Sequence, residues 1–260
     1  MVRFGICTSV ANAPAVKQAG WDYVEENAQS LFKGMEPDQK YEGREKVAAS
    51  VLPVSGANSL VPASIKITGS TVSMDALQAY MNNVLRRAGQ AGCRKLVFGS
   101  GGARHVPDGW DKSKATDQIV AFGKMMAPLA QAVGVTIVLE HLCRAECNIV
   151  NTLEEELAIV QRVNHPNFMA LLDTYHLWID ELPMSSVLPL MPFVRHVHMA
   201  DKDGRVVPGE SGKSDYRPVF ALLKEVGYDG ALSVEALNLS SIPEQGPKAL
   251  AFLKQQWAEA

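Results

Sequence analysis

The chain has 260 residues, a formal net charge of −3 at neutral pH and 47% hydrophobic residues. This length suits a single α/β barrel of about 250 residues, the slightly negative charge disfavours a nucleic-acid partner, and no apolar run reaches the roughly 18 residues of a membrane span. We therefore expect one domain over residues 1–260 that binds neither nucleic acid nor a membrane.

The amino terminus and the cysteines indicate the cellular compartment. Residues 1–7 already have a strand-like pattern and lack the long apolar segment of a signal peptide. The four cysteines contain no CxxC pair, so we expect free thiols rather than a disulfide or a structural zinc site. Both features predict a cytoplasmic protein.

In the amino-terminal part of the chain, short apolar runs alternate with amphipathic or polar segments. This pattern predicts strands over residues 2–7, 21–24, 51–58 and 95–98, the second of which ends in Glu25-Glu26-Asn27. Helices are expected between them: one with Pro14 in its first turn and Gly20 at its end, one over residues 36–46, and one over residues 73–91. Ser73 can cap the last of these helices. A glycine-rich loop, residues 99–104, follows the fourth strand.

The carboxyl-terminal part of the chain continues this alternation. Strands are predicted over residues 135–140, 168–173, 194–198 and 231–235. Helices are predicted over residues 117–133, 152–163, 216–226 and 245–257. Less regular helical structure is expected over residues 181–190, and a polar loop over residues 201–212.

Eight strands that alternate with helices at this spacing indicate parallel βαβ units. A doubly wound sheet is the main alternative, but the first strand lacks the GxGxxG turn of a dinucleotide-binding fold, and eight strands suit closure into a barrel. The glycine-rich loop contains no Gly-Lys-Ser/Thr sequence, which disfavours a P-loop. The predicted fold is therefore α/β, a single (β/α)8 TIM barrel.

Four successive predicted strands end in side chains that can bind a divalent cation: Glu140, Asp173, His198 and Glu235. A single acid at a strand end is commonly a helix cap or a solvated charge. In a barrel of parallel strands, however, these ends all lie on one face, where uncompensated acids would repel one another. Three carboxylates and an imidazole suit Mn²⁺, Mg²⁺, Co²⁺ or, less typically, Zn²⁺. We therefore predict one divalent-cation site at the mouth of the barrel.

The motifs of residues 135–236 occur in an order that is similar to that of a known family. They are Leu139-Glu140 with Glu146 six residues later, Leu172 to His176, His196-Val-His198, Arg205 to Gly212, and Gly227 to Glu235. As an ordered set they resemble the sugar phosphate isomerase/epimerase superfamily of xylose isomerase-like TIM barrels, and within it the ketose 3-epimerases. The amino-terminal half adds only a compatible alternation of strands and helices.

This resemblance implies roles for particular residues of these motifs. It implies that one divalent metal ion, with Mn²⁺ preferred, is held by Glu140, Asp173, His198 and Glu235. It implies that the catalytic acid/base pair is Glu140 and Glu235. It implies that the substrate contacts Glu146, His176 and Arg205. Arg205 lies one residue further from the histidine than in the family pattern, and the chain is shorter than a typical ketose epimerase, so the substrate loops differ more than the metal site.

The implied reaction is a proton transfer beside a sugar carbonyl, through a cis-enediolate. A divalent cation stabilises the negative charge that builds on the carbonyl oxygen. Two carboxylates on different sides of a carbon can remove a proton from one face and return one to the other, which inverts that centre. Proton transfer at one face alone would give aldose–ketose isomerisation. We therefore expect an enzyme of carbohydrate metabolism, a metal-dependent isomerase or epimerase that acts on a ketose or keto-sugar.

Three alternative functions remain open. The same metal site could serve a lyase or dehydratase that acts on an inosose or a 3-keto-glycoside, because an enediolate can expel a β-leaving group. A nuclease-like relative fits poorly, since it would need more histidines and a basic face. A non-catalytic sugar-binding barrel is the third alternative. The oligomeric state is also open, and includes a homo-oligomer.

Other polar residues near strand ends could be functional or structural. Glu25, Asn58 and Arg104 follow the second, third and fourth predicted strands, where they could bind substrate hydroxyls or a phosphate, or serve the structure. His196 is expected on the same face as His198, one layer deeper in the barrel. We expect His196 to pack or hydrogen-bond under the site rather than to bind the metal.

Overall fold

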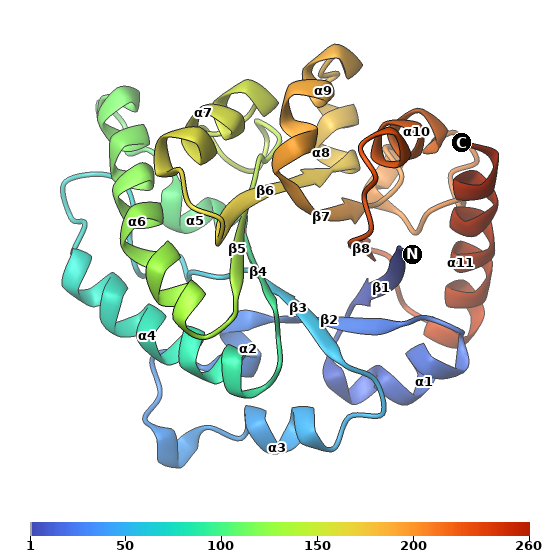
Figure 1. The fold of residues 1–260 in the computed structure, drawn as a ribbon, viewed down its shortest axis with the longest axis horizontal. Coiled ribbons are helices and arrows are strands. Elements are labelled where there is room, and N and C mark those ends of the chain that lie inside the picture. The colour runs from blue at the N-terminus through green and yellow to red at the C-terminus, as the bar shows by residue number, and fades with distance from the viewer. Residues whose placement is uncertain (1) are drawn as a thin grey trace.

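The structure, a computed structural model, describes residues 2–260. In this part of the chain, eight parallel strands close into a barrel in chain order (Figure 1). The strands are β1 (Arg3–Cys7), β2 (Tyr23–Asn27), β3 (Val54–Asn58), β4 (Lys95–Phe98), β5 (Thr136–Glu140), β6 (Phe168–Asp173), β7 (Val194–Met199) and β8 (Ala231–Val234). The barrel closes because β1 pairs with β8, from Arg3 opposite Ala231 to Ile6 opposite Val234. The predicted TIM barrel is confirmed.

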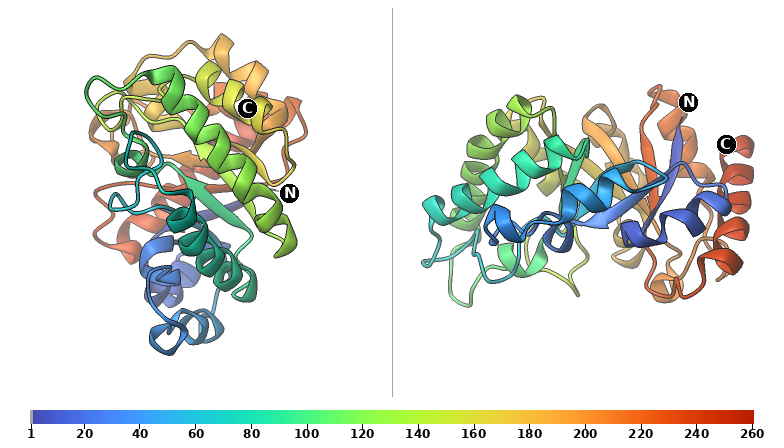
Figure 2. Two further views of the ribbon diagram at one scale, coloured as in Figure 1. Left: turned by 90° about the vertical axis from the view of Figure 1, so that its left-hand side faces the viewer. Right: turned by 90° about the horizontal axis from the view of Figure 1, so that it is seen from below.

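Helices connect the strands and lie on the outside of the barrel, as two further views show (Figure 2). The α-helices are α1 (Ala13–Gln18), α2 (Ala28–Phe32), α3 (Gly43–Ala48), α4 (Met74–Gln90), α5 (Gly101–Arg104), α6 (Lys112–Ala132), α7 (Leu153–Val163), α8 (Thr174–Ile179), α9 (Val187–Leu190), α10 (Arg217–Glu225) and α11 (Ile242–Glu259). Short 3₁₀ turns lie at Val10–Asn12, Asp38–Lys40, Met184–Ser186, Met191–Phe193 and Asp203–Arg205. No helix formed by residues 2–260 has the length and hydrophobicity needed to cross a membrane.

The long helix α4 illustrates how the sequence sets a helix and its packing. Ser73 precedes the helix, and its hydroxyl accepts a hydrogen bond from the Ala76 amide at 3.2 Å, which satisfies one of the free amides of the first turn. Apolar side chains then recur every three or four residues on the face that packs against the barrel. The buried ones are Leu77, Tyr80, Met81, Val84 and Leu85. The helix predicted over residues 73–91 is therefore confirmed.

Several segments differ from their predicted structure. Helix α6 begins at Lys112 rather than at residue 117, because the Asp111 carboxylate accepts from the Ser113 amide at 2.7 Å and caps the helix there. The helix predicted over residues 36–46 is a 3₁₀ turn followed by α3. The glycine-rich loop contains the short α5, and the exit from β6 is the short α8. Both are too short for a helical period to show in the sequence.

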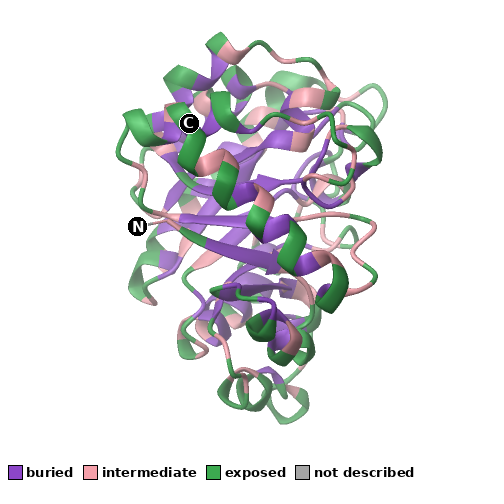
Figure 3. Ribbon diagram, turned by 90° about the vertical axis from the view of Figure 1, so that its right-hand side faces the viewer, coloured by how far each residue is buried: buried purple, intermediate pink, exposed green. Residues whose placement is uncertain are grey.

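Side chains along each strand alternate between the barrel interior and the helix layer. Buried residues follow the strands, and exposed residues lie on the outer faces of the helices (Figure 3). The interior has two halves of different chemistry. Around β4, β5 and β6 it is filled by the apolar side chains of Val97, Val138, Met169 and Leu171. On the side of β2, β7 and β8 it holds buried polar side chains: Tyr23, Glu25, His196, His198 and Ser233.

Strand β2 carries two consecutive acids near its end. The strand predicted from residues 21–24 was expected to end in Glu25-Glu26-Asn27, and β2 includes these three residues as strand. Its ladder with β1 includes Cys7 opposite Glu25. Because side chains alternate along a strand, Glu25 points into the barrel and Glu26 points toward the helices.

Candidate metal centre and active site

The mouth of the barrel brings together the four predicted strand-end residues, Glu140, Asp173, His198 and Glu235. Each offers one ligand atom, and these atoms lie within 4.8 Å of one another. His198 Nδ1 lies 3.2 Å from Glu140 Oε1 and 3.5 Å from Glu235 Oε2. It lies 3.9 Å from Asp173 Oδ2. The side chains predicted to bind a cation therefore form one compact group.

The donor set of this group fits a divalent cation. Three carboxylates and one imidazole nitrogen are the oxygen-rich ligands that Mn²⁺ and Mg²⁺ accept, and they could also hold Co²⁺ or Zn²⁺. Asp173 and His198 are at most 1% exposed, and Glu140 is 5% exposed. Ionised carboxylates that are buried this close together are unfavourable unless a positive charge lies among them. A bound cation would supply that charge.

Glu140 is positioned by the ends of β4 and β5. It is the last residue of β5, and alternation from Val138 turns its side chain into the barrel. Gly99 leaves room for it, because a Cβ at this position would overlap with Glu140 Oε2. Arg104 donates to the carbonyl oxygens of Phe98 at 3.0 Å and Glu140 at 2.7 Å. Arg104 is fully buried and ties the two strand ends together, so of its two predicted roles the structural one holds.

His176 is held in a single orientation by α8 and by the loop after β5. Asp173 caps α8, since its Oδ1 accepts from the His176 amide at 3.1 Å. His176 Nδ1 accepts from the Cys143 amide at 3.2 Å, so the neutral ring carries its proton on Nε2. Among the described residues Nε2 has no hydrogen-bond partner, and it lies 4.0 Å from Glu146 Oε2. His176 is therefore a buried donor beside the four strand-end residues.

Arg205 reaches the mouth of the barrel from the loop after β7. Its guanidinium donates to Glu146 Oε1 at 2.8 Å and to Glu235 Oε2. It also packs over the ring of Tyr175, 4.7 Å from the centroid. Asn58, at the end of β3, donates to the other oxygen of Glu235 at 2.8 Å. Glu146 and Arg205 thus lie in the group that holds Glu235.

A cavity of about 500 Å³ opens at these residues, a volume within the range of small-molecule sites. Five residues predicted from the sequence line it: Glu140, Glu146, His176, Arg205 and Glu235. Small or polar residues from the first half of the chain complete the lining, among them Gln29, Asn58, Ser59, Ser100, Gly101 and Gly102. Asn58 was a sequence candidate. Gln29 and Ser100 were missed, because a single amide or hydroxyl near a strand end carries no distinctive pattern.

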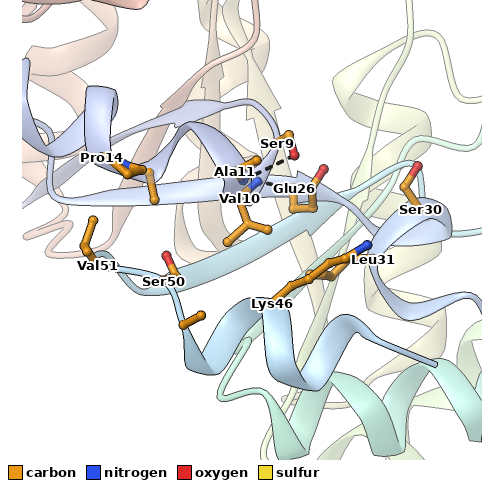
Figure 4. A pocket seen from close by; sticks show the side chains of 12 residues that line it. Ser9, Val10, Ala11, Pro14, Glu26, Ser30, Leu31, Lys46, Ser50 and Val51 are labelled. Carbon is orange, nitrogen blue, oxygen red and sulfur yellow. Dashed lines mark hydrogen bonds between the residues drawn. The ribbon is translucent and has the colours of Figure 1, made fainter.

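A second cavity, of about 510 Å³, lies outside the ring of strands, beside α3 (Figure 4). Glu26 faces it from the outer side of β2. Its carboxylate accepts from the Val10 amide at 2.6 Å and from the Asn27 amide at 3.0 Å, so its oxygens already have donors. Lys46 contributes the other charged group of the lining. Because acids do not converge in this lining, we place the candidate chemistry at the strand ends instead.

Comparison with known proteins identifies the family. The family model of the xylose isomerase-like TIM barrel matches residues 13–256. The chain belongs to this family. The four cysteines of this xylose isomerase-like barrel are free thiols, as the sequence predicted.

Two curated relatives and one solved structure show what this xylose isomerase-like barrel is similar to. A ketose 3-epimerase of Arthrobacter globiformis is 30% identical over 52% of this chain and 46% of the relative. An L-ribulose 3-epimerase of Mesorhizobium japonicum is 32% identical over 58% of this chain and 49% of the relative. The chain therefore spans about half the length of the curated relatives it matches. The structure of D-psicose 3-epimerase with D-tagatose from Clostridium cellulolyticum has a TM-score of 0.84 over 98% of this chain and 99% of that chain, at 19% identity, which establishes the fold alone.

The carboxylates at the mouth of this xylose isomerase-like barrel differ in their electrostatic surroundings. Burial, together with the nearby Glu235 carboxylate, raises the pKa of Glu140 above its ordinary value. Burial also opposes ionisation of Glu235, but His198 and Arg205 outweigh it and lower the pKa of Glu235. Burial would raise the pKa of Asp173, yet its electrostatic interactions with His176, Arg205 and His198 lower it to about 2. The pKa of Glu140 is thus raised, whereas the pKa of Glu235 is lowered.

Glu25 and His196 lie one layer below the four strand-end residues. His196 Nε2 lies 2.7 Å from Glu25 Oε2, so the prediction that His196 hydrogen-bonds under the site is confirmed. Glu25 is fully buried and lies outside the lining of the cavity. Of the two roles considered for Glu25, the structure does not support substrate contact, because the side chain points down into the barrel interior.

Proposed function

We propose that this protein is a divalent-metal-dependent sugar epimerase or isomerase that acts on a ketose or a related keto-sugar. The observation that carries the proposal is the convergence of four cation ligands beside a cavity of about 500 Å³. The relatives named ketose 3-epimerase and L-ribulose 3-epimerase support the epimerase reaction. The substrate is a small sugar, and it enters from the carboxyl ends of the strands.

The proposed metal is Mn²⁺, and its ligands are Glu140, Asp173, His198 and Glu235. When bound, the ion supplies Lewis-acid stabilisation of the negative charge that develops on adjacent substrate oxygens. The protein holds the ligands ready for it. Arg205 and Asn58 orient the Glu235 carboxylate from two sides, and Gly99 leaves the space that the Glu140 carboxylate occupies.

Glu140 and Glu235 are the proposed acid/base pair. They come from the end of β5 and from the residue after β8, which are separate positions on the ring of strands. One carboxylate removes the proton from the carbon beside the carbonyl, which gives a cis-enediolate of the substrate, and the other returns a proton to the opposite face. Opposite displacement of their pKa values suits two carboxylates with different protonation at the start of the reaction.

Three further residues are proposed to bind the substrate. The Nε2–H of His176 donates to a substrate oxygen, since the Cys143 amide occupies the other ring nitrogen. Glu146 accepts from a substrate hydroxyl, and Arg205 donates to one while it holds Glu146 and Glu235. These contacts orient the reacting carbon between the two carboxylates.

Solvent exchange tests the proposed function. Mn²⁺-loaded protein is incubated in D₂O with a panel of ketoses that includes L-ribulose and D-tagatose, and mass spectrometry or NMR locates deuterium in the sugar. We expect deuterium at the carbon beside the carbonyl. Glu140→Gln is expected to slow the exchange by about 10²-fold or more, because it removes one member of the proton-transfer pair.

Glu154→Gln is the matched control, since Glu154 is an exposed glutamate on α7 and does not line the cavity. It is expected to exchange at the wild-type rate. Protein that binds Mn²⁺ but exchanges no ketose would contradict the proposal. Loss of water or of an aglycone in place of exchange would indicate a lyase on the same site.

A further inference from the structure

Glu25 is a fully buried carboxylate beneath the four proposed cation ligands. Its Oε1 lies 2.9 Å from His198 Nε2, and its Oε2 lies 2.7 Å from His196 Nε2. Oε2 also accepts from the Ser233 hydroxyl at 2.6 Å. Each of these side chains is at most 1% exposed. Glu25 therefore accepts hydrogen bonds from β7 and β8 across the interior of the barrel.

The position of Glu25 determines which nitrogen of His198 can bind a cation. An ionised carboxylate only accepts hydrogen bonds, so the nitrogen that faces Glu25, Nε2, carries a proton. The other nitrogen, Nδ1, faces Glu140 and the remaining strand-end acids. Its lone pair is then directed at the position where those acids converge. A metal-binding histidine commonly has such a carboxylate on its second nitrogen, which orients the ring and makes it a better ligand.

The surrounding strands are built to accommodate this carboxylate. The Tyr23 hydroxyl lies 2.7 Å from the Ser233 hydroxyl, which extends the hydrogen-bonded chain toward the base of the barrel. Tyr23 can occupy that position because its neighbour is Gly5, where a Cβ would overlap with the tyrosine ring. On the other side, a Cβ at Gly56 would lie 3.3 Å from Glu25 Oε2, closer than ordinary contact. Two glycines thus leave the space that the network needs.

A purely structural role for Glu25 is the weaker explanation. The opposite half of the barrel interior is filled by Val97, Val138 and Leu171, which shows that apolar side chains can fill this barrel. Apolar packing carries no desolvation cost, whereas a buried carboxylate with two imidazoles does. The polar network occurs on the side of the barrel where His198 must be oriented, and it ends on that histidine.

We propose that Glu25 is a positioning residue of the cation site, which acts through His198 by fixing its tautomer and ring orientation and by adding a negative charge near the ion. This inference rests on the proposed function only in that the four strand-end residues bind a divalent cation. Glu25 itself does not contact the substrate cavity. Its role is therefore in the affinity of the site for the ion rather than in the transfer of protons.

Glu25→Gln tests this role, with Glu26→Gln as the matched control. The two glutamates are neighbours on β2 and lose the same charge, but Glu26 points to the outer face of the strand. Isothermal titration with Mn²⁺ is expected to show a Kd for Glu25→Gln that is about 10–100-fold higher than that of the wild type. Glu26→Gln is expected to bind Mn²⁺ as the wild type does. Circular dichroism in EDTA checks that each variant is folded.

The tautomer can be read in the wild-type protein, which keeps the inference testable if Glu25→Gln does not fold. Histidine ring nitrogens are labelled with ¹⁵N, the protein is loaded with diamagnetic Zn²⁺, and two-bond correlation spectra locate the ring protons. We expect His198 to carry a slowly exchanging proton on Nε2 and to bind the ion through Nδ1. Coordination through Nε2, or an unchanged Mn²⁺ affinity in folded Glu25→Gln, would overturn the inference.

The two proposals fail in distinguishable ways. If the wild type binds Mn²⁺, and Glu25→Gln binds it more weakly, but no ketose exchanges deuterium, the proposed function is wrong and the role of Glu25 holds. If ketoses exchange deuterium but the affinity of Glu25→Gln for Mn²⁺ is unchanged, the proposed function holds and the role of Glu25 is wrong. A wild type that binds no divalent cation contradicts both.

Discussion

The two ring nitrogens of His198 have different surroundings. Its Nε2 faces Glu25, and its Nδ1 faces the acids at the mouth. Burial by itself would lower the pKa of His198, but the carboxylates of Glu25 and Glu235 raise it well above its ordinary value. The metal-free ring therefore keeps its second proton to a higher pH than an ordinary histidine does. A cation that binds Nδ1 must displace one proton.

This competition predicts that Mn²⁺ affinity depends on pH. Below the raised pKa of His198 a proton occupies Nδ1 and competes with the ion; above it the nitrogen is free, so affinity rises with pH and then levels off. While one proton is displaced, the Kd is expected to fall by about tenfold per pH unit. Titration calorimetry at several pH values, in two buffers of different ionisation enthalpy, measures both the Kd and the protons released. A Kd that does not change with pH would contradict this prediction.

At the scale of an element, the loop after β7 carries Arg205 and is held by one buried acid. Asp201 accepts from the Ser211 amide at 3.0 Å and from the Ser211 hydroxyl at 2.7 Å. It also accepts from the Gly209 amide at 3.1 Å and from the Tyr216 hydroxyl at 2.9 Å. Asp201 opens the loop and its donors lie 8 to 15 residues further along the chain, so Asp201 ties the start of the loop to its second half and sets the path that presents Arg205 to the mouth.

Substitution of Asp201 should therefore destabilise the protein and loosen the proposed substrate site. Asp201→Ala leaves the buried Tyr216 hydroxyl and the partly buried donors of Gly209 and Ser211 without this acceptor, and it is expected to lower the free energy of unfolding by about 2–3 kcal/mol. Tyr216→Phe removes one donor and should cost about 1 kcal/mol. Urea denaturation of the metal-free variants measures both values. We also expect a raised KM for Asp201→Ala, through displacement of Arg205. Equal stability of the two variants would show that the loop is held by other contacts.

At the scale of the whole molecule, the barrel interior separates packing from chemistry. The half around β4, β5 and β6 is apolar, and the other half holds the polar network that leads from Tyr23 to His198. The four proposed cation ligands lie above both halves, at the ends of four consecutive strands. A cation at this position would therefore join four strands of the closed ring, and its binding would stabilise the folded state relative to an unfolded chain whose ligands are dispersed.

Metal addition should accordingly raise the melting temperature. At a free Mn²⁺ concentration of about 100 times its Kd the expected stabilisation is about 2.7 kcal/mol, and for a chain of this size that corresponds to about 5–10 °C in Tm. EDTA should reverse the shift. The double variant Glu140→Gln, Glu235→Gln provides the control, because it keeps the side-chain volumes but loses two of the charged ligands. Its Tm is expected to be the same with and without Mn²⁺, as recorded by circular dichroism, and a shift equal to that of the wild type would place the ion elsewhere.

The sequence predicted most of the fold and the composition of the candidate site. The eight strands and the long helices α4 and α7 follow from hydrophobic periodicity and from capping residues such as Ser73. The strand-end acids and His198 could be identified because parallel strands in a barrel end on one face. That residues 1–260 form a single domain, that the protein is cytoplasmic and that it forms a homo-oligomer stay predictions.

Only the tertiary structure decided the roles of Glu25 and Arg104. In the sequence, both look like polar residues that follow a strand, and both could have bound a substrate. In the structure, Arg104 ties β4 to β5, and Glu25 meets His196 across the barrel, 171 residues further along the chain. Local patterns reflect neighbours a few residues away, so they encode periodicity, caps and strand ends. Whether a buried charge can be accommodated depends on its hydrogen-bond partners, and only closure of the barrel brings those partners within hydrogen-bonding distance.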